Sequence, residues 1–140
     1  MRCDRDRLAR LADIAAAHNI LVVSDEIHCD MPLYGHTHIP FAMASDTAAH
    51  CSITVGAPSK TFNIAGFRTG AAIIPNKQLR DNIQIMIEDN KNYGRTIFGM
   101  LTFITAYEKC EYYADELMES LEGTKDYIVG FLKERMPKIK

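Results

Sequence analysis

The sequence lacks several features that would assign a protein to a class at once. No apolar run approaches the roughly 18–20 residues that a membrane-spanning helix needs. Sixteen lysines and arginines stand against eighteen aspartates and glutamates, so there is no basic excess of the kind that holds nucleic acid. The first residues contain no apolar stretch typical of a secretory signal. We therefore expect a cytoplasmic protein with neither a membrane nor a nucleic-acid partner.

Closely spaced cysteines are also missing. Cys3, Cys29, Cys51 and Cys110 are far apart, and no C-x-x-C pair occurs. This spacing suggests neither a disulfide framework nor a zinc ribbon. We therefore expect reduced and mostly buried thiols.

The sequence does contain an alternation of helical and strand patterns, within a length of 140 residues that suits about one domain. Apolar periodicity predicts helices over 4–18, 77–91, 96–109 and 112–135, and strands over 20–23, 51–56 and 70–74. Proline, glycine and polar residues predict loops over most of 30–50 and 57–69, with a short helix near 41–45. This pattern indicates an α/β fold.

The predicted sheet is small for the strand that begins it. Residues 20–23 form a continuous apolar run, which is typical of a parallel strand buried on both faces. Three short strands and the helices beside them offer little cover for such a strand. The chain also ends directly after a long helix. We therefore expect it to be a piece of a larger α/β protein.

The first cluster of polar residues follows this strand and reads Ser24-Asp25-Glu26-Ile27-His28-Cys29-Asp30. Ligand sites in open α/β sheets lie at the carboxyl ends of strands. Two carboxylates beside apolar residues are costly to desolvate, unless Asp25 pairs with a cationic group. The simpler alternative is that Asp25 and Glu26 begin a loop or cap a turn.

The second cluster lies between the second and third strands and reads Ala57-Pro58-Ser59-Lys60-Thr61-Phe62-Asn63-Ile64-Ala65-Gly66-Phe67-Arg68. Lys60 stands among small and apolar neighbours. Such a setting disfavours an ammonium ion and favours the neutral amine, which is the form that Schiff-base chemistry needs. The alternative is an ordinary solvated lysine in a loop.

Together, Ser24–His28 and the Ala57–Gly66 run resemble the pyridoxal-phosphate (PLP) enzymes of aminotransferase fold type I. More narrowly, they are similar to the cystathionine β-lyase, or C–S lyase, branch of the class I/II aminotransferase family, as is His36–Phe41. The resemblance implies part of the large domain of a three-layer α/β sandwich. Residues 1–110 would be the second half of that PLP-binding domain. Residues 111–140 would be the long linking helix and the start of a truncated small domain.

The resemblance also implies roles for individual residues. Lys60 would form a Schiff base with PLP and then act as the general base at the substrate Cα. Asp25 would hold the pyridine nitrogen through a charge-assisted hydrogen bond. Arg68 and Ser59 would approach the phosphate, and His28 would lie near the ring. No metal ion is implied.

The activity implied by the resemblance is a β-lyase reaction. A PLP-dependent C–S lyase would release a thiol, pyruvate and ammonia from an L-cysteine S-conjugate such as L-cystathionine. An aminotransferase acting on an amino acid is the alternative, because Lys60 and Asp25 serve both reactions. The family further implies a small amino-acid substrate and a homodimer for the full-length relative.

Two other interpretations start from different residues. A metal site could draw on a group within 24 positions, namely His28, Cys29, Asp30, His36, His38, His50 and Cys51. However, prolines and glycine mark this segment as a loop, and no ligand pair has the spacing of a known zinc site. A non-catalytic interaction module is the other interpretation, because the helix over 96–109 is apolar enough to be an interface. A place in the core is the commoner explanation for such a helix.

Overall fold

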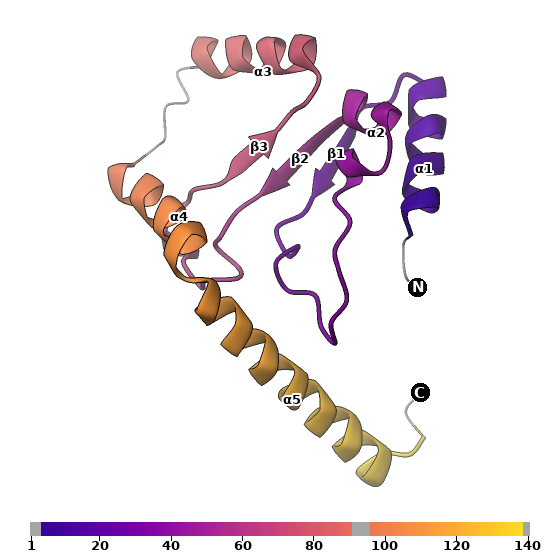
Figure 1. Ribbon diagram of the computed structural model, residues 1–140, viewed down its shortest axis with the longest axis vertical. Helices are drawn as coiled ribbons and strands as arrows, with labels where there is room; N and C mark the ends of the chain where they lie inside the picture. Colours follow the sequence, from indigo (N-terminus) through magenta and orange to yellow (C-terminus); the bar gives the residue numbers. More distant parts are fainter. Residues whose placement is uncertain (1–3, 91–95, 139–140) are drawn as a thin grey trace.

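The computed structural model describes residues 4–90 and 96–138, which form an α/β structure around one sheet (Figure 1). Cys3 and position 91, the last residue of one predicted helix, lie outside these ranges. The elements in chain order are α1 (Arg5–Ala17), β1 (Val22–Asp25), η1 (Phe41–Met43), α2 (Asp46–His50), β2 (Ser52–Gly56), η2 (Ala65–Phe67), β3 (Ala71–Ile73), α3 (Lys77–Asp89), α4 (Ile97–Lys109) and α5 (Glu111–Arg135).

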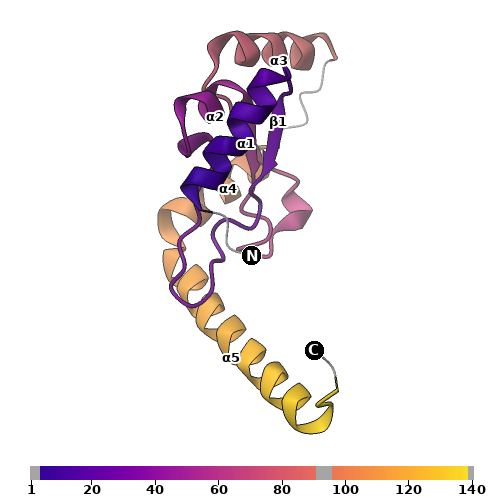
Figure 2. The same ribbon diagram turned by 90° about the vertical axis from the view of Figure 1, so that its right-hand side faces the viewer.

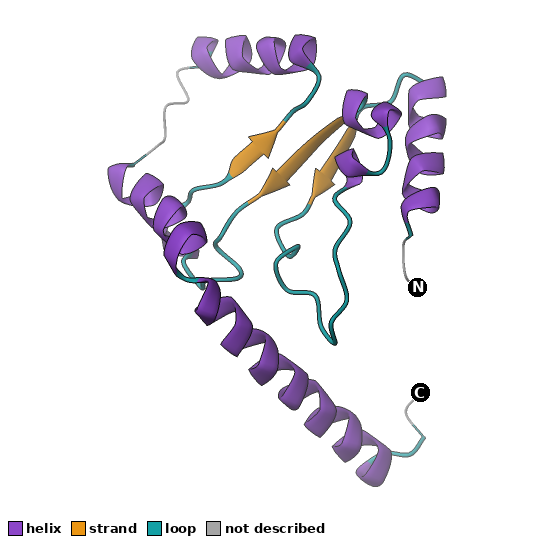
Figure 3. Ribbon diagram, viewed as in Figure 1, coloured by secondary structure: helices purple, strands orange, loops and turns teal. Residues whose placement is uncertain are grey.

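The sheet has the strand order β1-β2-β3 and is mixed (Figure 3). Strands β1 and β2 are parallel, with a register that runs from Val22 opposite Ser52 to Asp25 opposite Val55. Strand β3 returns antiparallel to β2 and places Ala71 opposite Gly56. A parallel pair needs a long crossover, and the segment 26–51 with η1 and α2 supplies it. The α/β fold class expected from the sequence is confirmed.

A small core forms where α1 meets the crossover segment. Ala12 of α1 packs with Phe41, Ala44 and Ala48, and all four side chains are buried. The three alanines let the two helices approach closely, and the Phe41 ring fills the space between them. Figure 2 shows α1 and α2 together on one side of β1. Val22 packs against this core, so the core also fixes the start of the sheet.

The ends of these helices follow from local sequence. Asp4 caps α1 by accepting a hydrogen bond from the Arg7 amide at 2.9 Å. Ser45 caps α2 in the same way through the Ala48 amide at 3.1 Å. Because α2 has five residues, its apolar periodicity was too short to predict it as a separate helix.

The long helix α5 extends away from the sheet (Figure 1), and the loop between β1 and η1 docks on it. The Tyr34 hydroxyl donates to the Asp126 carboxylate at 2.6 Å, and its backbone amide donates to Glu122. The Lys125 ammonium lies 3.9 Å from the centre of the Tyr34 ring, in a cation–π contact. None of the described helices is long and apolar enough to cross a membrane.

Two expectations about apolar segments were wrong. Strand β1 begins two residues later than predicted, because a continuous apolar run does not by itself set the register of pairing. It is not buried on both faces, since Val23 is 61% exposed and Asp25, on the same face, is exposed as well. Helix α4 is not a core helix either, because Ile97 and Phe98 are largely exposed. In both cases the described part of the chain supplies no covering layer.

The expectation about thiols was partly wrong. Cys29, Cys51 and Cys110 are free, as the sequence predicts. However, all three are half-buried rather than buried. Each lies at the end of a helix or in a loop.

Phe41 makes the core testable. Because its side chain is 5% exposed, we expect Phe41→Ala to lower the free energy of unfolding by about 3 kcal/mol through lost burial and a cavity. Phe98→Ala is the matched control, since Phe98 is 73% exposed and should lose less than about 0.5 kcal/mol. Urea unfolding followed by circular dichroism measures both. Equal losses in the two variants would contradict this description of the core.

Candidate functional site

The candidate site lies at the edge of the sheet where β1 and β2 both end. Asp25 is the last residue of β1 and pairs with Val55. The Glu26 amide continues the ladder by donating to the Val55 carbonyl at 2.8 Å. A turn carrying Ser59 and Lys60 follows β2 directly, as the loop below the β2 arrowhead in Figure 1 shows. Parallel pairing therefore brings Asp25 and the lysine turn to the same edge.

Arg68 reaches this edge by a different route. Because β3 runs antiparallel to β2, β3 starts at the edge where β2 ends. Arg68 stands three residues before β3 and closes η2 in a left-handed conformation, with φ of 50°. A non-glycine residue in this region stores about 1–2 kcal/mol of strain, which the surrounding turn must offset. The backbone thus places Arg68 at the same edge as Asp25 and Lys60.

Asp25 stabilises the loop after β1 through one of its two carboxylate oxygens. Its Oδ1 accepts a hydrogen bond from the Ile27 amide at 3.2 Å, which is the turn-capping role that the sequence allowed as an alternative. Within the described residues we find no partner for Oδ2, and the side chain is exposed. One carboxylate oxygen is therefore available to a ligand.

Lys60 and Arg68 are exposed cations. The sequence predicted an apolar setting for Lys60, and this expectation was wrong for the described chain. Its neighbours Pro58 and Thr61 are buried, whereas the lysine itself faces outward. Neither Lys60 nor Arg68 forms an ion pair within 4–90 and 96–138. Two positive charges at this edge thus have no protein counter-ion there.

His28 and Ser59 complete the set of expected residues. His28 is exposed in the loop after β1, and its carbonyl accepts from the Met31 amide at 3.1 Å. Ser59 is half-buried, and its carbonyl accepts from the Ile64 amide at 3.1 Å. Both side chains lie in segments that leave the same edge of the sheet as Asp25 and Lys60.

Glu26 is a structural carboxylate that the sequence reasoning did not single out. It is 7% exposed, and its Oε1 accepts from both the Ser24 hydroxyl at 2.9 Å and the Phe41 amide at 2.8 Å. His38 Nε2 lies 2.9 Å from the other oxygen. These partners offset the desolvation of a buried carboxylate. The sequence contained a signal for this role, because two carboxylates beside an apolar strand are costly to desolvate. In the structure this cost falls on Glu26, which is buried, and not on Asp25, which is exposed.

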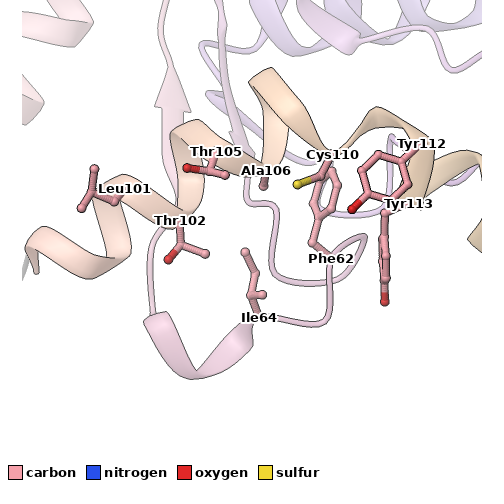
Figure 4. Close-up of a pocket in the computed structure, with 9 residues that line it drawn as sticks. All are labelled: Phe62, Ile64, Leu101, Thr102, Thr105, Ala106, Cys110, Tyr112 and Tyr113. Carbon is pink, nitrogen blue, oxygen red and sulfur yellow. The ribbon is translucent and has the colours of Figure 1, made fainter.

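Two cavities lie close to this edge. One, of about 330 Å³, lies between the lysine turn and the junction of α4 and α5, where Phe62 and Ile64 point toward the helices (Figure 4). The other, of about 860 Å³, has Glu26, Cys29 and Tyr107 in its wall. Neither is lined by Asp25 or Lys60. The expected ligand groups therefore stand on an open edge beside the cavities.

The metal interpretation finds no support in this arrangement. Among the described residues, no group of three or more histidines, cysteines, aspartates or glutamates could hold a metal ion. His38 instead contacts Glu26, and His50 lies beside Asn76. These histidines serve contacts within the fold.

Cys29 provides a pH-dependent test of the local environment. Burial raises the pKa of the Cys29 thiol to about 11, and the Asp30 carboxylate, 3.4 Å from Sγ, adds to the rise. Because the thiolate is the nucleophile, we expect iodoacetamide at pH 8 to alkylate Cys29 on the order of a hundredfold more slowly in the folded chain than in urea. The rate should rise with pH until about pH 11.

Mass spectrometry of the peptide that contains Cys29 measures this rate. Asp30→Asn should accelerate alkylation, because it removes a negative charge that disfavours the thiolate. Equal rates for folded and unfolded chains would show that the thiol is not desolvated in the way described.

Comparisons with known proteins show the family and the fold of the chain. The sequence model of the family "Aminotransferase class I and II" matches residues 1–134. Cystathionine beta-lyase PatB of Bacillus subtilis is 40% identical over 136 residues, which are 97% of this chain and 35% of that protein.

Two solved structures extend the comparison. A PLP-bound candidate aminotransferase from Clostridium difficile 630 matches with a TM-score of 0.93 and 31% identity, over 100% of this chain and 36% of its own. A PLP-bound C–S lyase from Staphylococcus hominis matches with a TM-score of 0.84 and 30% identity, over 96% of this chain and 33% of its own. The chain thus spans about a third of the length of these relatives. The chain belongs to the class I and II aminotransferase family.

Proposed function

We propose that this chain carries the PLP-binding lysine of a C–S β-lyase of the cystathionine β-lyase type. The observation that carries the proposal is the meeting of Asp25, Lys60 and Arg68 at one edge of the sheet. The relatives add support, since a cystathionine beta-lyase matches at 40% identity over 97% of the chain. Because the chain spans about a third of that relative, the activity is proposed for the protein to which this sequence corresponds.

The side chains at the edge fit the chemistry of PLP. An exposed guanidinium without a protein counter-ion suits a phosphate group, and Arg68 provides it. The Ser59 hydroxyl would be a second donor for phosphate, and His28 would lie near the ring. The unpartnered oxygen of Asp25 suits a protonated pyridine nitrogen. The exposed Lys60 amine suits an aldehyde carbon.

Within this proposal, each residue has one task. When bound, PLP supplies an electron sink that stabilises negative charge at the substrate Cα. Lys60 Nζ takes the proton from that carbon as a general base. Asp25 would hold the ring in its protonated form, and Arg68 and Ser59 would orient the cofactor through its phosphate. The substrate is an amino acid, which the family implies.

The fate of the Cα negative charge separates the two candidate reactions. In the lyase, a thiolate leaves from Cβ, and hydrolysis of the remainder yields pyruvate and ammonia. An aminotransferase would instead pass the amino group of the substrate on to a keto acid. The second candidate has a specific observation in its favour, since the C. difficile candidate aminotransferase matches with a TM-score of 0.93. Lys60 and Asp25 serve both reactions.

We further infer the domain roles and assembly of the longer protein. Residues 1–110 would belong to the PLP-binding large domain, and 111–140 would link it to a small domain. The projection of α5 away from the sheet supports this division (Figure 1). A homodimer in the cytoplasm is the assembly that we propose for the full-length protein.

Lys60→Ala tests the proposed cofactor lysine. We expect the 140-residue chain, incubated with excess PLP, to develop a visible absorbance band, and borohydride to fix the cofactor covalently on the peptide that contains Lys60. Lys60→Ala should abolish both signals, because Lys60 is the lysine of the turn that leaves the same edge of the sheet as Asp25. Lys109→Ala, at the end of α4, is the matched control and should keep both. Fixation on another lysine would refute the assignment.

Product analysis tests the reaction type. We expect the longer protein to convert L-cystathionine into a thiol and pyruvate in equal amounts. We expect little or no turnover by this chain alone. Pyruvate is measured with lactate dehydrogenase, and thiol with Ellman's reagent. Amino-group transfer to an added keto acid without thiol release would favour the aminotransferase instead. Rapid pyruvate release by the isolated 140-residue chain would contradict the expectation of little turnover.

A further inference from the structure

Asp30 accepts hydrogen bonds from two segments that are far from it in sequence. Its Oδ2 accepts from the Thr61 hydroxyl and from the Tyr107 hydroxyl, each at 3.1 Å. Its Oδ1 accepts from Cys29 Sγ at 3.4 Å. The carboxylate thereby joins the loop after β1, the turn after β2 and helix α4.

Thr61 connects this carboxylate to Lys60, because the two residues are adjacent. The Thr61 side chain is fully buried, with 0% exposure, whereas Lys60 is exposed. The turn is closed by two backbone hydrogen bonds, from the Phe62 amide to the Pro58 carbonyl at 2.9 Å and from the Ile64 amide to the Ser59 carbonyl at 3.1 Å. Anchoring Thr61 therefore fixes the backbone direction of Lys60.

Aromatic packing holds the other side of the turn. The Phe62 ring meets Tyr107 edge to face at 5.8 Å and stacks on Tyr113 at 6.0 Å. Figure 4 shows Phe62 directed toward the junction of the two helices. Tyr107 thus contacts the turn twice, through its ring to Phe62 and through its hydroxyl to Asp30.

The donors to Asp30 are neutral groups. Desolvation of the phenol, joined by the Asp30 charge, raises the pKa of Tyr107 well above its usual value. The hydroxyl therefore stays protonated and continues to donate at neutral pH. Asp30 forms no ion pair within the described ranges, so the hydrogen bonds from Thr61, Tyr107 and Cys29 hold the carboxylate in place.

We propose that Asp30 is a positioning residue that holds the lysine turn against α4 through Thr61 and Tyr107. Asp30 does not touch the reacting atoms. It sets where the Lys60 amine emerges at the sheet edge beside Asp25, and this purpose rests on the function proposed above. The pairing of Asp30 with Thr61 and Tyr107 is separate from the residues expected to contact PLP.

Thr61→Val tests the proposed role of Asp30, because it keeps the buried shape and removes the hydroxyl that donates to Asp30. Thr61→Ser restores the donor, and Thr124→Val is the matched control, since the Thr124 hydroxyl donates to the Ser120 carbonyl at 2.8 Å in α5, remote from the turn. Hydrogen exchange followed by mass spectrometry on the chain without cofactor is the first measurement. Titration of the visible band with PLP is the second, and urea unfolding reports global stability.

We expect Thr61→Val to accelerate exchange of the peptide covering 58–64 about tenfold and to weaken PLP binding about tenfold, as for loss of one hydrogen bond to a charged group. Tyr107→Phe should act in the same direction and keep its ring on Phe62. Thr61→Ser should stay within about twofold of the unaltered chain, and Thr124→Val should change neither measurement.

Two outcomes would overturn the proposal. Exchange over 58–64 that does not change in Thr61→Val would show that the turn does not depend on Asp30. Exchange that rises equally along the whole chain, with a matching loss of global stability, would show a general structural role. A different result bears on the proposed function alone: local exchange as expected, but no visible band with PLP even in the unaltered chain.

Discussion

Parallel pairing of β1 with β2 brings Asp25 and the lysine turn to one edge of the sheet. The register that sets Asp25 opposite Val55 makes the two strands end together, so the loops that leave them share one edge of the sheet. The antiparallel return of β3 then brings Arg68 to the same edge from the other side. A shift of one residue in the β1 register would turn Asp25 to the opposite face and leave Lys60 without it.

Carboxylates divide into two kinds around this edge. Glu26 and Asp30 are held by several donors each and organise the loop after β1, from within the fold. Asp25, the last residue of β1, keeps one oxygen without a partner in the described residues. For Glu26 and Asp30, hydrogen bonds from neighbouring donors offset the free-energy cost of desolvating the carboxylate. Asp25, which is expected to hold a ligand, does not incur this desolvation cost, because it is exposed.

The relation between the lysine turn and α4 depends on contacts across long sequence separations. Tyr107 follows Asp30 by 77 residues and lies within hydrogen-bond distance of it. Phe62 packs between Tyr107 and Tyr113, which lie on the two sides of the α4–α5 junction. The outer face of α4 remains open, with Ile97 and Phe98 exposed, while the chain spans about a third of the length of its relatives. The described contacts thus order the inner side of α4 and leave its outer side uncovered.

The sequence by itself determined the fold class, most of the element positions and the two clusters that meet at the site. Apolar periodicity and capping residues such as Asn76 act over a few positions, so they can be recognised locally. The α/β class and the helices followed from such patterns, and the family resemblance followed from the residues of the two clusters. Only the tertiary structure decided that β1 has one exposed face, that Lys60 faces outward, and that Glu26 and Asp30 are structural carboxylates. Burial and hydrogen-bond partners depend on residues distant in the chain, and no local pattern records which of those residues come into contact.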